Sequence, residues 1–400
     1  MTSTIERVLL ISLLLSVSTL LQAQETYQEF LRKQREGIQE QDRAFAQYQA
    51  AVTAEYQKFY EQQQKDFEEY RNQIENQWGK NNALTSTKKD WVSYGNDFSS
   101  RKSVDFEKGV AKVEVLVDES LTKNRPAIEQ RLQSEISKAV VGKGNEDPLE
   151  AKEKSPPIAK PILSGQVETK DGQPVTEVNA KQFAEQLVSL SKWQEEKVVG
   201  KDGKTRIAIV VTFPLVPNHI KIRAQNFKDQ AQEYARKFNM NPSLVFAVIH
   251  TESYFNPKAR SSAPAFGLMQ LVPSSGARDA YMHVYGKDCL VTPEYLFQPE
   301  NNMMLGAGYL DVLMRRNFKG IKDELSRVYC AIAAYNTGPG NVAKTFVGKR
   351  EVGPAVAAIN KMSSKEVFDQ LRSHLPFQET RDYLVKVTER MPIYSEWSQQ

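Results

Sequence analysis

Residues 239–253, NMNPSLVFAVIHTES, predict the helix on which the rest of the interpretation depends. Asn241 is a favourable N-cap residue and Pro242 suits the first helical turn. At 100° per residue, Glu252 lies in the same direction as Val245, within an apolar stripe that normally faces a protein core. We therefore expect its side chain to point inward, unlike most of the 49 acidic residues of the chain.

The position of Glu252 at the end of this helix has a chemical consequence. The carbonyl groups of a helix C-terminus carry partial negative charge, and apolar surroundings penalise an ionised carboxyl group. Both effects favour the protonated form near neutral pH, which is the form that a general acid needs. Helix position alone leaves a second interpretation open, in which Glu252 is exposed where the helix frays.

Two further segments are typical of a ligand-binding cleft. Residues 261–270, SSAPAFGLMQ, are small and flexible, and the glycine of GLMQ suits a close approach of the backbone to a ligand. Gln270 can both donate to and accept from the hydroxyl and acetamide groups of a sugar. Residues 323–342, DELSRVYCAIAAYNTGPGNV, predict a helix that stops at GPG. Tyr335 and Asn336 fall at its end, where side chains can line a cleft.

The motifs ES at 252–253, GLMQ at 267–270 and AAYNTGPG at 333–340 occur in this order. Together they resemble the catalytic domain of lytic murein transglycosylases of the soluble-lytic-transglycosylase type, which is related in fold to goose-type lysozyme. The stretch from residue 279 to residue 313 is most similar to membrane-bound members of this family. The resemblance implies that residues 223–400 form an all-α, lysozyme-like transglycosylase domain.

The resemblance also implies roles for individual residues. Glu252 would be the single general acid/base, Ser261 would contact the N-acetyl sugar, and Gln270 and Tyr335 would bind and position the glycan. The remaining substrate-binding candidates are Asn336 and, from the late ETRDYLVKV segment, Glu379 and Tyr383. The SSAPAFG loop departs from the family pattern, because Pro264 stands where glycine is common, and a different path of this loop is expected.

The reaction that the resemblance implies needs one carboxyl group. Glu252 would protonate the oxygen of the β-1,4 bond between N-acetylmuramic acid and N-acetylglucosamine. It would then accept a proton from the muramic C6 hydroxyl, which attacks its own anomeric carbon and forms a 1,6-anhydro end without water. No metal or organic cofactor is expected. Two alternatives remain: a lysozyme-like muramidase that hydrolyses the same bond, and a non-catalytic peptidoglycan-binding envelope protein.

Residues 1–23 are typical of a signal peptide, because Arg7 precedes the apolar run VLLISLLLSVSTLL and Ala23 suits a cleavage site. This predicts export to the periplasm, with association with the outer membrane or cell wall left open. An uncleaved anchor helix is the alternative. A lipobox cysteine is missing, since no cysteine precedes Cys289, so no lipid attachment site is expected.

Residues 24–222 predict an accessory domain with helical and α+β parts, so the expected class of the whole chain is α+β. In residues 25–78, apolar side chains recur in steps of three and four and proline is absent, which indicates one or two long amphipathic helices. Their aromatic stripe, which includes Phe45 and Tyr48, is interpreted as a packing face. Alternating segments with Asp-Gly turns at 171–172 and 202–203 predict strands. The domain is expected to dock on the catalytic domain or on a cell-envelope protein.

Composition limits the remaining partners. The net charge of +4 results from 53 basic and 49 acidic residues, and the basic residues form no cluster, so nucleic acid is not an expected partner. The four histidines are scattered and form no cysteine/histidine group, so no metal site is expected. A disulfide between Cys289 and Cys330 in an oxidising compartment is left open.

Overall fold

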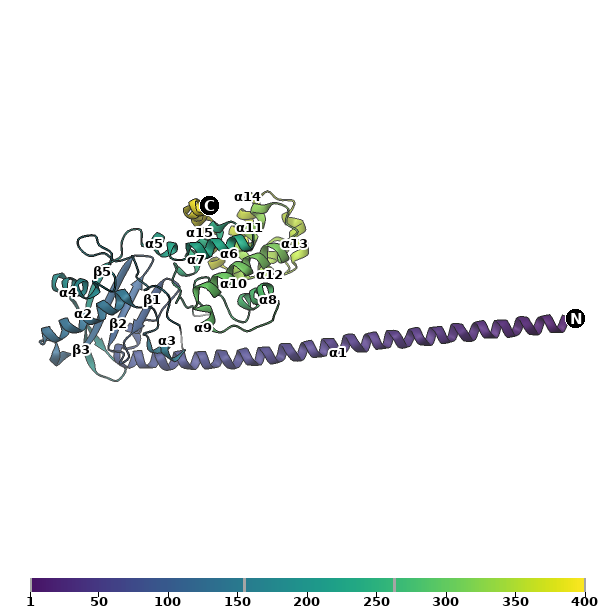
Figure 1. Ribbon diagram of the computed structural model, residues 1–400, viewed down its shortest axis with the longest axis horizontal. Coiled ribbons are helices and arrows are strands. Elements are labelled where there is room, and N and C mark those ends of the chain that lie inside the picture. The colour runs from purple at the N-terminus through teal and green to yellow at the C-terminus, as the bar shows by residue number, and fades with distance from the viewer. Residues whose placement is uncertain (1, 154–155, 262–263, 399–400) are drawn as a thin grey trace. The chain divides into compact units, whose positions relative to one another are not determined.

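The computed structural model describes residues 2–153, 156–261 and 264–398, with side chains from residue 26 onward except those of residues 49 and 52. It begins with a single helix, α1 (Thr2–Trp78), where one or two were predicted (Figure 1). By its contacts the chain divides into two units, residues 1–62 and residues 63–400. Within the part of the chain that the structure describes, no helix combines the length and apolar character that a membrane crossing requires. The side chains of the predicted signal peptide lie outside the described residues.

The aromatic stripe of α1 is buried over only part of the helix. In the first unit, Phe45 is 61% and Tyr48 is 43% exposed, so the predicted packing face stays a prediction for this stretch. In the second unit, Tyr70, Ile74 and Trp78 are buried and pack against the β-sheet. The helical period was therefore visible in the sequence, but it did not reveal which turns meet a partner surface.

Five antiparallel strands form one sheet in the order β1-β2-β3-β5-β4. The strands are β1 (Asp90–Tyr94), β2 (Ser100–Asp105), β3 (Val110–Asp118), β4 (Gln194–Val199) and β5 (Thr205–Pro214). The Asp-Gly turn at 202–203 joins β4 to β5 as predicted. The Asp-Gly pair at 171–172 closes only an isolated bridge between Glu168 and Pro174, so the strands expected there are not part of the sheet.

Helices cover both faces of the sheet. Alternate side chains of a strand point to opposite sides, so each face presents apolar side chains that the helices bury. On one side, Val113 and Val115 of β3 belong to a core shared with α2 (Arg125–Val141) and α4 (Ala180–Leu190). On the other, Leu116 packs with the end of α1 and with Leu149 of the short helix α3 (Pro148–Lys152). Two 3-10 turns, η1 (Lys80–Asn82) and η2 (Glu119–Leu121), complete this region.

In the second half of the chain, between residues 219 and 398, the regular elements that the structure describes are helices, and isolated β-bridges occur in the loop that spans residues 254–275. Its helices are α5 (His219–Gln225), α6 (Lys228–Lys237), α7 (Pro242–Ser253), α8 (Gly276–Tyr285), α9 (Pro293–Leu296), α10 (Pro299–Asp311), α11 (Glu324–Thr337), α12 (Pro339–Val347), α13 (Val352–Ile359), α14 (Ser364–His374) and α15 (Gln378–Arg390), with a π turn η3 (Val312–Asn317) and a 3-10 turn η4 (Met391–Ser398). Helix α7 is central, since every residue from 243 to 250 is buried. The α+β class and the all-α second half are confirmed.

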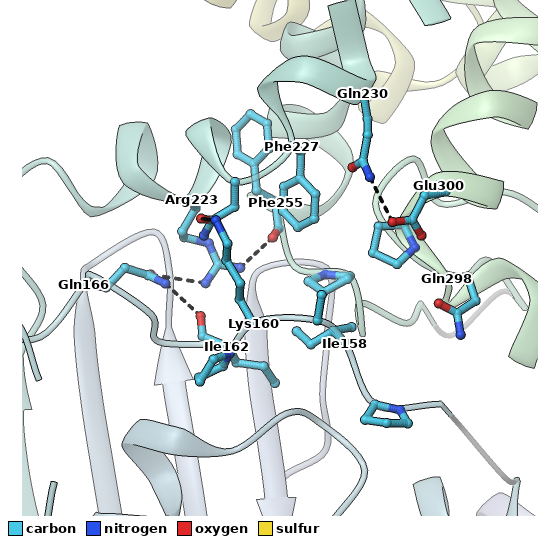
Figure 2. Close-up of a pocket in the computed structure, with 16 residues that line it drawn as sticks. Ile158, Lys160, Ile162, Gln166, Arg223, Phe227, Gln230, Phe255, Gln298 and Glu300 are labelled. Atoms are coloured by element: carbon cyan, nitrogen blue, oxygen red, sulfur yellow. Dashed lines mark hydrogen bonds between the residues drawn. The ribbon is translucent and has the colours of Figure 1, made fainter. Parts of the chain in front are cut away.

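Arg223 of α5 joins the sheet region to the end of α7 (Figure 2). Its guanidinium group donates to the main-chain oxygens of Tyr254 and Phe255, both at 2.8 Å, and to Gln166 Oε1 at 3.2 Å. It also lies 3.4 Å from the centre of the Phe106 ring. One buried side chain thus links the segment between α3 and α4, the turn after β2 and the residues that follow the central helix.

The two cysteines are free. Cys330 is buried in α11, whereas Cys289 is exposed in the loop before α9. The possible disulfide between them is therefore wrong, because one thiol is enclosed in the helical core and the other faces solvent.

Candidate active site

Glu252 occupies the last turn of α7, as predicted. Asn241 caps the start of the helix by accepting a hydrogen bond from the Ser243 amide at 2.9 Å, and Tyr254, at φ 51°, ends it in the left-handed conformation. The Glu252 side chain is only 5% exposed. The interpretation in which the helix frays and exposes this carboxyl group is therefore wrong.

The surroundings of Glu252 favour its neutral form. Burial is the largest influence and raises the pKa of the Glu252 carboxyl above its usual value, and the nearby Glu379 acts in the same direction. Lys88 and the hydroxyl group of Tyr383 lower the pKa of Glu252, but burial outweighs them. The balance suits a group that must first release a proton and later accept one.

A cleft of about 710 Å³ opens beside Glu252. Six of the seven predicted site residues line it: Glu252, Ser261, Gln270, Tyr335, Asn336 and Glu379. They come from α7, from the loop that follows it, from α11 and from α15. The fold thus brings together residues that are up to 127 positions apart in the sequence (379 minus 252).

The backbone conformation of the loop after α7 directs Gln270 into the cleft. Gln270 has a φ of 47°, and its Nε2 donates to the oxygens of Ala259 and Gly267, both at 3.0 Å. Among the described residues, its buried Oε1 has no hydrogen-bond partner. A buried acceptor at the wall of a cleft is available to a ligand donor.

Gly267 was expected to allow a close approach of the backbone to a ligand, but the structure gives a different reason for glycine at this position. A Cβ atom at this position would lie 2.3 Å from the Leu296 oxygen and 2.4 Å from Asn302 Nδ2. The close approach that requires glycine is therefore made to the α9–α10 segment and not to a ligand. Asn302 in turn accepts a hydrogen bond from the Met269 amide at 2.7 Å and donates to the Phe266 oxygen at 2.8 Å, which fixes the loop.

The end of α11 supplies the opposite part of the cleft. The Tyr335 hydroxyl donates to the Met269 oxygen at 2.8 Å, which links α11 to the loop before Gln270. Asn336 accepts a hydrogen bond from Thr380 Oγ1 at 2.6 Å, which links α11 to α15. Both side chains are therefore held in place before a substrate arrives.

Helix α15 places two of the predicted residues at different depths. Tyr383 is buried next to Glu252; burial, followed by the charge of Glu252, raises its pKa well above the usual value. Its buried hydroxyl lowers the pKa of Glu252 and, in the part of the chain that the structure describes, has no other partner. Glu379 is 75% exposed at the rim.

Two family models match the chain. Residues 54–226 match "Membrane-bound lytic murein transglycosylase C, N-terminal domain", and residues 229–355 match "Transglycosylase SLT domain". The membrane-bound lytic murein transglycosylase C of Serratia proteamaculans is 34% identical over 332 residues, which cover 82% of this chain and 88% of the relative. The chain belongs to the membrane-bound lytic murein transglycosylase C family. The relative from Actinobacillus succinogenes is 32% identical over 331 residues, 82% of this chain and 87% of its own length.

Solved transglycosylase structures match part of this family member. An inactive mutant of lytic transglycosylase Slt from Pseudomonas aeruginosa is 28% identical, with a TM-score of 0.33, over 42% of this chain and 24% of that one. The 70 kDa soluble lytic transglycosylase of Escherichia coli is 24% identical, with a TM-score of 0.33, over 43% and 24% of the two chains. The matched region thus spans about a quarter of those longer proteins.

Sequence reasoning missed part of the cleft wall of this transglycosylase. Thr337, Asn341, Phe377 and Thr380 neighbour predicted residues, so the motifs could have pointed to them. Lys88 could not have been found in this way, because it precedes β1 and lies 164 positions before Glu252 (252 minus 88).

Residues 262–263 lie outside the described residues, so the different path expected of the Pro264 loop stays a prediction. No group of three or more potential metal ligands occurs among the described residues.

Proposed function

We propose that Glu252 is the general acid/base with which this chain cleaves peptidoglycan as a lytic transglycosylase. The enzyme class follows from the family, which is named for murein transglycosylases. The observation that supports the assignment to Glu252 is its buried carboxyl group, whose pKa is raised by that burial, at the wall of a cleft large enough for sugar rings.

In the proposed reaction, Glu252 donates its proton to the glycosidic oxygen as the bond from that oxygen to the anomeric carbon of N-acetylmuramic acid breaks. The C6 hydroxyl of the same sugar then attacks the anomeric carbon and returns its proton to Glu252. The products are a free 4-hydroxyl group on N-acetylglucosamine and a 1,6-anhydromuramic acid end. Intramolecular attack of this kind profits from an effective molarity of about 10⁵ M or more.

The other cleft residues would position the glycan. Gln270 Oε1 is a buried acceptor for a sugar hydroxyl or amide, and Tyr335 forms a fixed wall next to it. We assign Ser261, Asn336 and the rim residue Glu379 to substrate binding because they line the same cleft, and Tyr383 to the support of Glu252. No metal or organic cofactor has a part in these steps.

The test is the variant Glu252→Gln, which keeps the shape of the side chain but has no acidic proton. We expect turnover of purified sacculi to fall by at least a thousandfold, while sedimentation with sacculi is retained. Glu389→Gln changes an exposed carboxyl group on α15 and is the matched control. Substantial turnover by Glu252→Gln would remove the assignment.

Mass spectrometry of the products separates the proposal from a muramidase. Anhydro ends weigh one water less than reducing ends, so the two reactions give distinct masses. A digest that contains mainly reducing ends would favour the hydrolase. The non-catalytic alternative requires that the wild-type chain leaves sacculi intact.

We also propose where the chain works and how it is divided. The family is membrane-bound by name, which supports a cell-envelope location. The finer proposal is a cleaved signal peptide at residues 1–23, an accessory domain at 24–222 and the transglycosylase domain at 223–400, active in the periplasm. The mass of the mature chain tests it, since cleavage after Ala23 predicts Gln24 as the first residue.

The proposed partners are glycan strands and, for the N-terminal region, an envelope protein. Phe30, Phe45 and Tyr48 are exposed on α1, which supports a protein-binding role of this helix. Serine substitutions at Phe30 and Phe45 would then release the chain from envelope fractions without loss of turnover, and unchanged fractionation would contradict the role.

With mixed charges and a net charge of +4, no binding to nucleic acid is expected in a filter-binding assay at physiological salt.

A further inference from the structure

Lys88 reaches the proposed acid from the N-terminal region. Its Nζ lies 3.4 Å from Glu252 Oε2 and 3.6 Å from Glu379 Oε1, so one ammonium group bridges two carboxyl groups. The Lys88 side chain is 37% exposed at the cleft, whereas Glu252 is almost completely enclosed. The bridge therefore connects the buried acid to the rim.

The segment around Lys88 is fixed by its own hydrogen bonds. Thr87 Oγ1 donates to Asp90 Oδ2 at 2.7 Å and accepts from the amides of Lys89 and Asp90 at 3.3 and 3.1 Å. The Thr87 amide donates to the Asp90 oxygen at 2.9 Å, and Lys89 Nζ pairs with Glu107 at 2.5 Å. Lys88 thus lies in a hydrogen-bonded turn directly before β1. Because the backbone of this turn is fixed, the position of the Lys88 ammonium group in the cleft is fixed as well.

We propose that Lys88 is a positioning residue of the transglycosylase reaction, which bridges Glu252 and Glu379 and sets how readily Glu252 holds its proton. This inference rests on the proposed role of Glu252 as acid/base. It means that the N-terminal region contributes to the chemistry and is not only an accessory.

The physical reason is a balance of two opposed effects on one carboxyl group. Burial favours the neutral acid that starts the reaction, and an ammonium group within 4 Å favours the anion that forms when the proton has left. Without Lys88, the anion would be left in an apolar enclosure and would be costly to form. Glu379 also pairs with Lys88, which weakens the effect of the Lys88 charge on Glu252. The titratable or charged groups that face Glu252 are Lys88 from the turn before β1, Tyr335 from α11, and Glu379, Tyr383 and, behind Tyr383, Arg390 from α15.

The first test is the pH profile of kcat/KM for the full-length Lys88→Met variant on sacculi. The alkaline limb of this profile reports the free-enzyme pKa of the acid that must be protonated. Because Lys88 lowers the pKa of Glu252, its removal raises that pKa, and we expect the alkaline limb to move up by about one pH unit. We expect Lys88→Arg to restore most of the wild-type profile. An unmoved limb in a folded Lys88→Met variant would overturn the proposal.

Glu379 provides a second test with the opposite sign. In Glu379→Gln, the carboxyl group that raises the pKa of Glu252 is gone, and Lys88 has only Glu252 as a partner. The alkaline limb should move down. In the double variant the effect of Glu379→Gln should shrink, because much of it acts through Lys88. Equal effects of Glu379→Gln with and without Lys88 would show that no bridge exists.

Controls separate failure of this inference from failure of the proposed function. Lys108→Met removes an exposed lysine that pairs with Asp105 at 3.2 Å in the same region, and should leave the profile unchanged. If Glu252→Gln keeps its turnover, the proposed function fails. If Glu252→Gln is inactive and the Lys88→Met limb does not move, only the role of Lys88 fails. The melting temperature of each variant excludes loss of fold as the cause.

Discussion

At the scale of single residues, Glu252 shows what a buried acid costs the folded chain. Its pKa is raised mainly by burial, so the folded protein binds a proton more tightly than the unfolded one. Where the folded pKa of a carboxyl group exceeds the unfolded value, stability decreases as the pH rises between the two. Glu252 therefore has no cost below its ordinary value of 4.5 and its full cost above the raised value.

The variant Glu252→Gln should accordingly be more stable than the wild type at about pH 8, with a gain that disappears by about pH 4. Each kcal/mol recovered corresponds to roughly 2–4 °C in Tm for a domain of this size. Differential scanning calorimetry at both pH values provides the measurement. Glu389→Gln, on the exposed side of α15, should show no such pH dependence. An equal Tm difference at both pH values would contradict the burial argument.

At the scale of elements, the loop between α7 and α8 is the part of the site that depends most on local geometry. Gly267 has a φ of +77° and packs against Leu296 and Asn302 at distances that leave no room for a side chain. Asn302 then holds the backbone on both sides of Gly267, and Gln270 follows three residues later. Packing of α10 thus determines the orientation of a residue that lines the cleft.

Gly267→Ala should lower stability by roughly 3 kcal/mol or more, because a strained φ adds to a direct clash. The matched control is Gly172→Ala, where φ is +73° and nothing lies within 4 Å of the added Cβ, so only the strain of about 1–2 kcal/mol remains. Thermal unfolding followed by circular dichroism compares the two. Similar losses of Tm in both variants would show that the packing against Asn302 is not tight.

The elements also show what the sequence could and could not predict. The α7 helix was predictable, because its cap, its apolar stripe and its end are local features. The β4–β5 hairpin was predictable from one Asp-Gly turn, whereas β2, with the polar sequence SRKSVD, gave no alternating signal. The exposed turns of α1 show that an apolar period does not reveal whether a partner surface is present.

At the scale of the whole molecule, the sheet region and the helical half meet through a few directed contacts. Arg223 satisfies two main-chain oxygens directly after α7 and one side-chain oxygen of Gln166 (Figure 2). The Tyr254 hydroxyl also donates to Glu107 Oε1, from the turn after β2, at 2.9 Å. These contacts fix the end of the helix that carries Glu252 relative to the sheet.

Arg223→Met should destabilise the protein by roughly 2–4 kcal/mol, since it leaves buried oxygen atoms without donors. We also expect a lower kcat, because the end of α7 loses its support. Gln166→Leu removes one of the three hydrogen bonds of Arg223 and the hydrogen bond that Gln166 Nε2 donates to the Ile162 oxygen at 2.7 Å. It should cost about 1–3 kcal/mol with little change in kcat. Urea unfolding and turnover of sacculi provide the measurements. A kcat equal to that of the wild type in Arg223→Met would show that the junction does not position the site.

At this scale, prediction from the sequence was limited because the residues of the cleft lie far apart along the chain. The three catalytic-domain motifs could be combined only because a resemblance placed them in one cleft; their spacing alone did not bring Glu252, Gln270 and Tyr335 together. Lys88 had no such guide. It belongs to a polar segment between a helix and a strand, and only the folded chain shows that this segment ends beside the acid.

The walls of the cleft are drawn from positions as early as 88 and as late as 380. A polypeptide that is still being synthesised can already carry Glu252 while it lacks α15, and with it Tyr383 and Glu379. Such an unfinished chain lacks part of the enclosure around Glu252 and part of the cleft wall. The enclosure around Glu252 can therefore form only once nearly the entire chain has been made, because its walls come from segments far apart in the sequence.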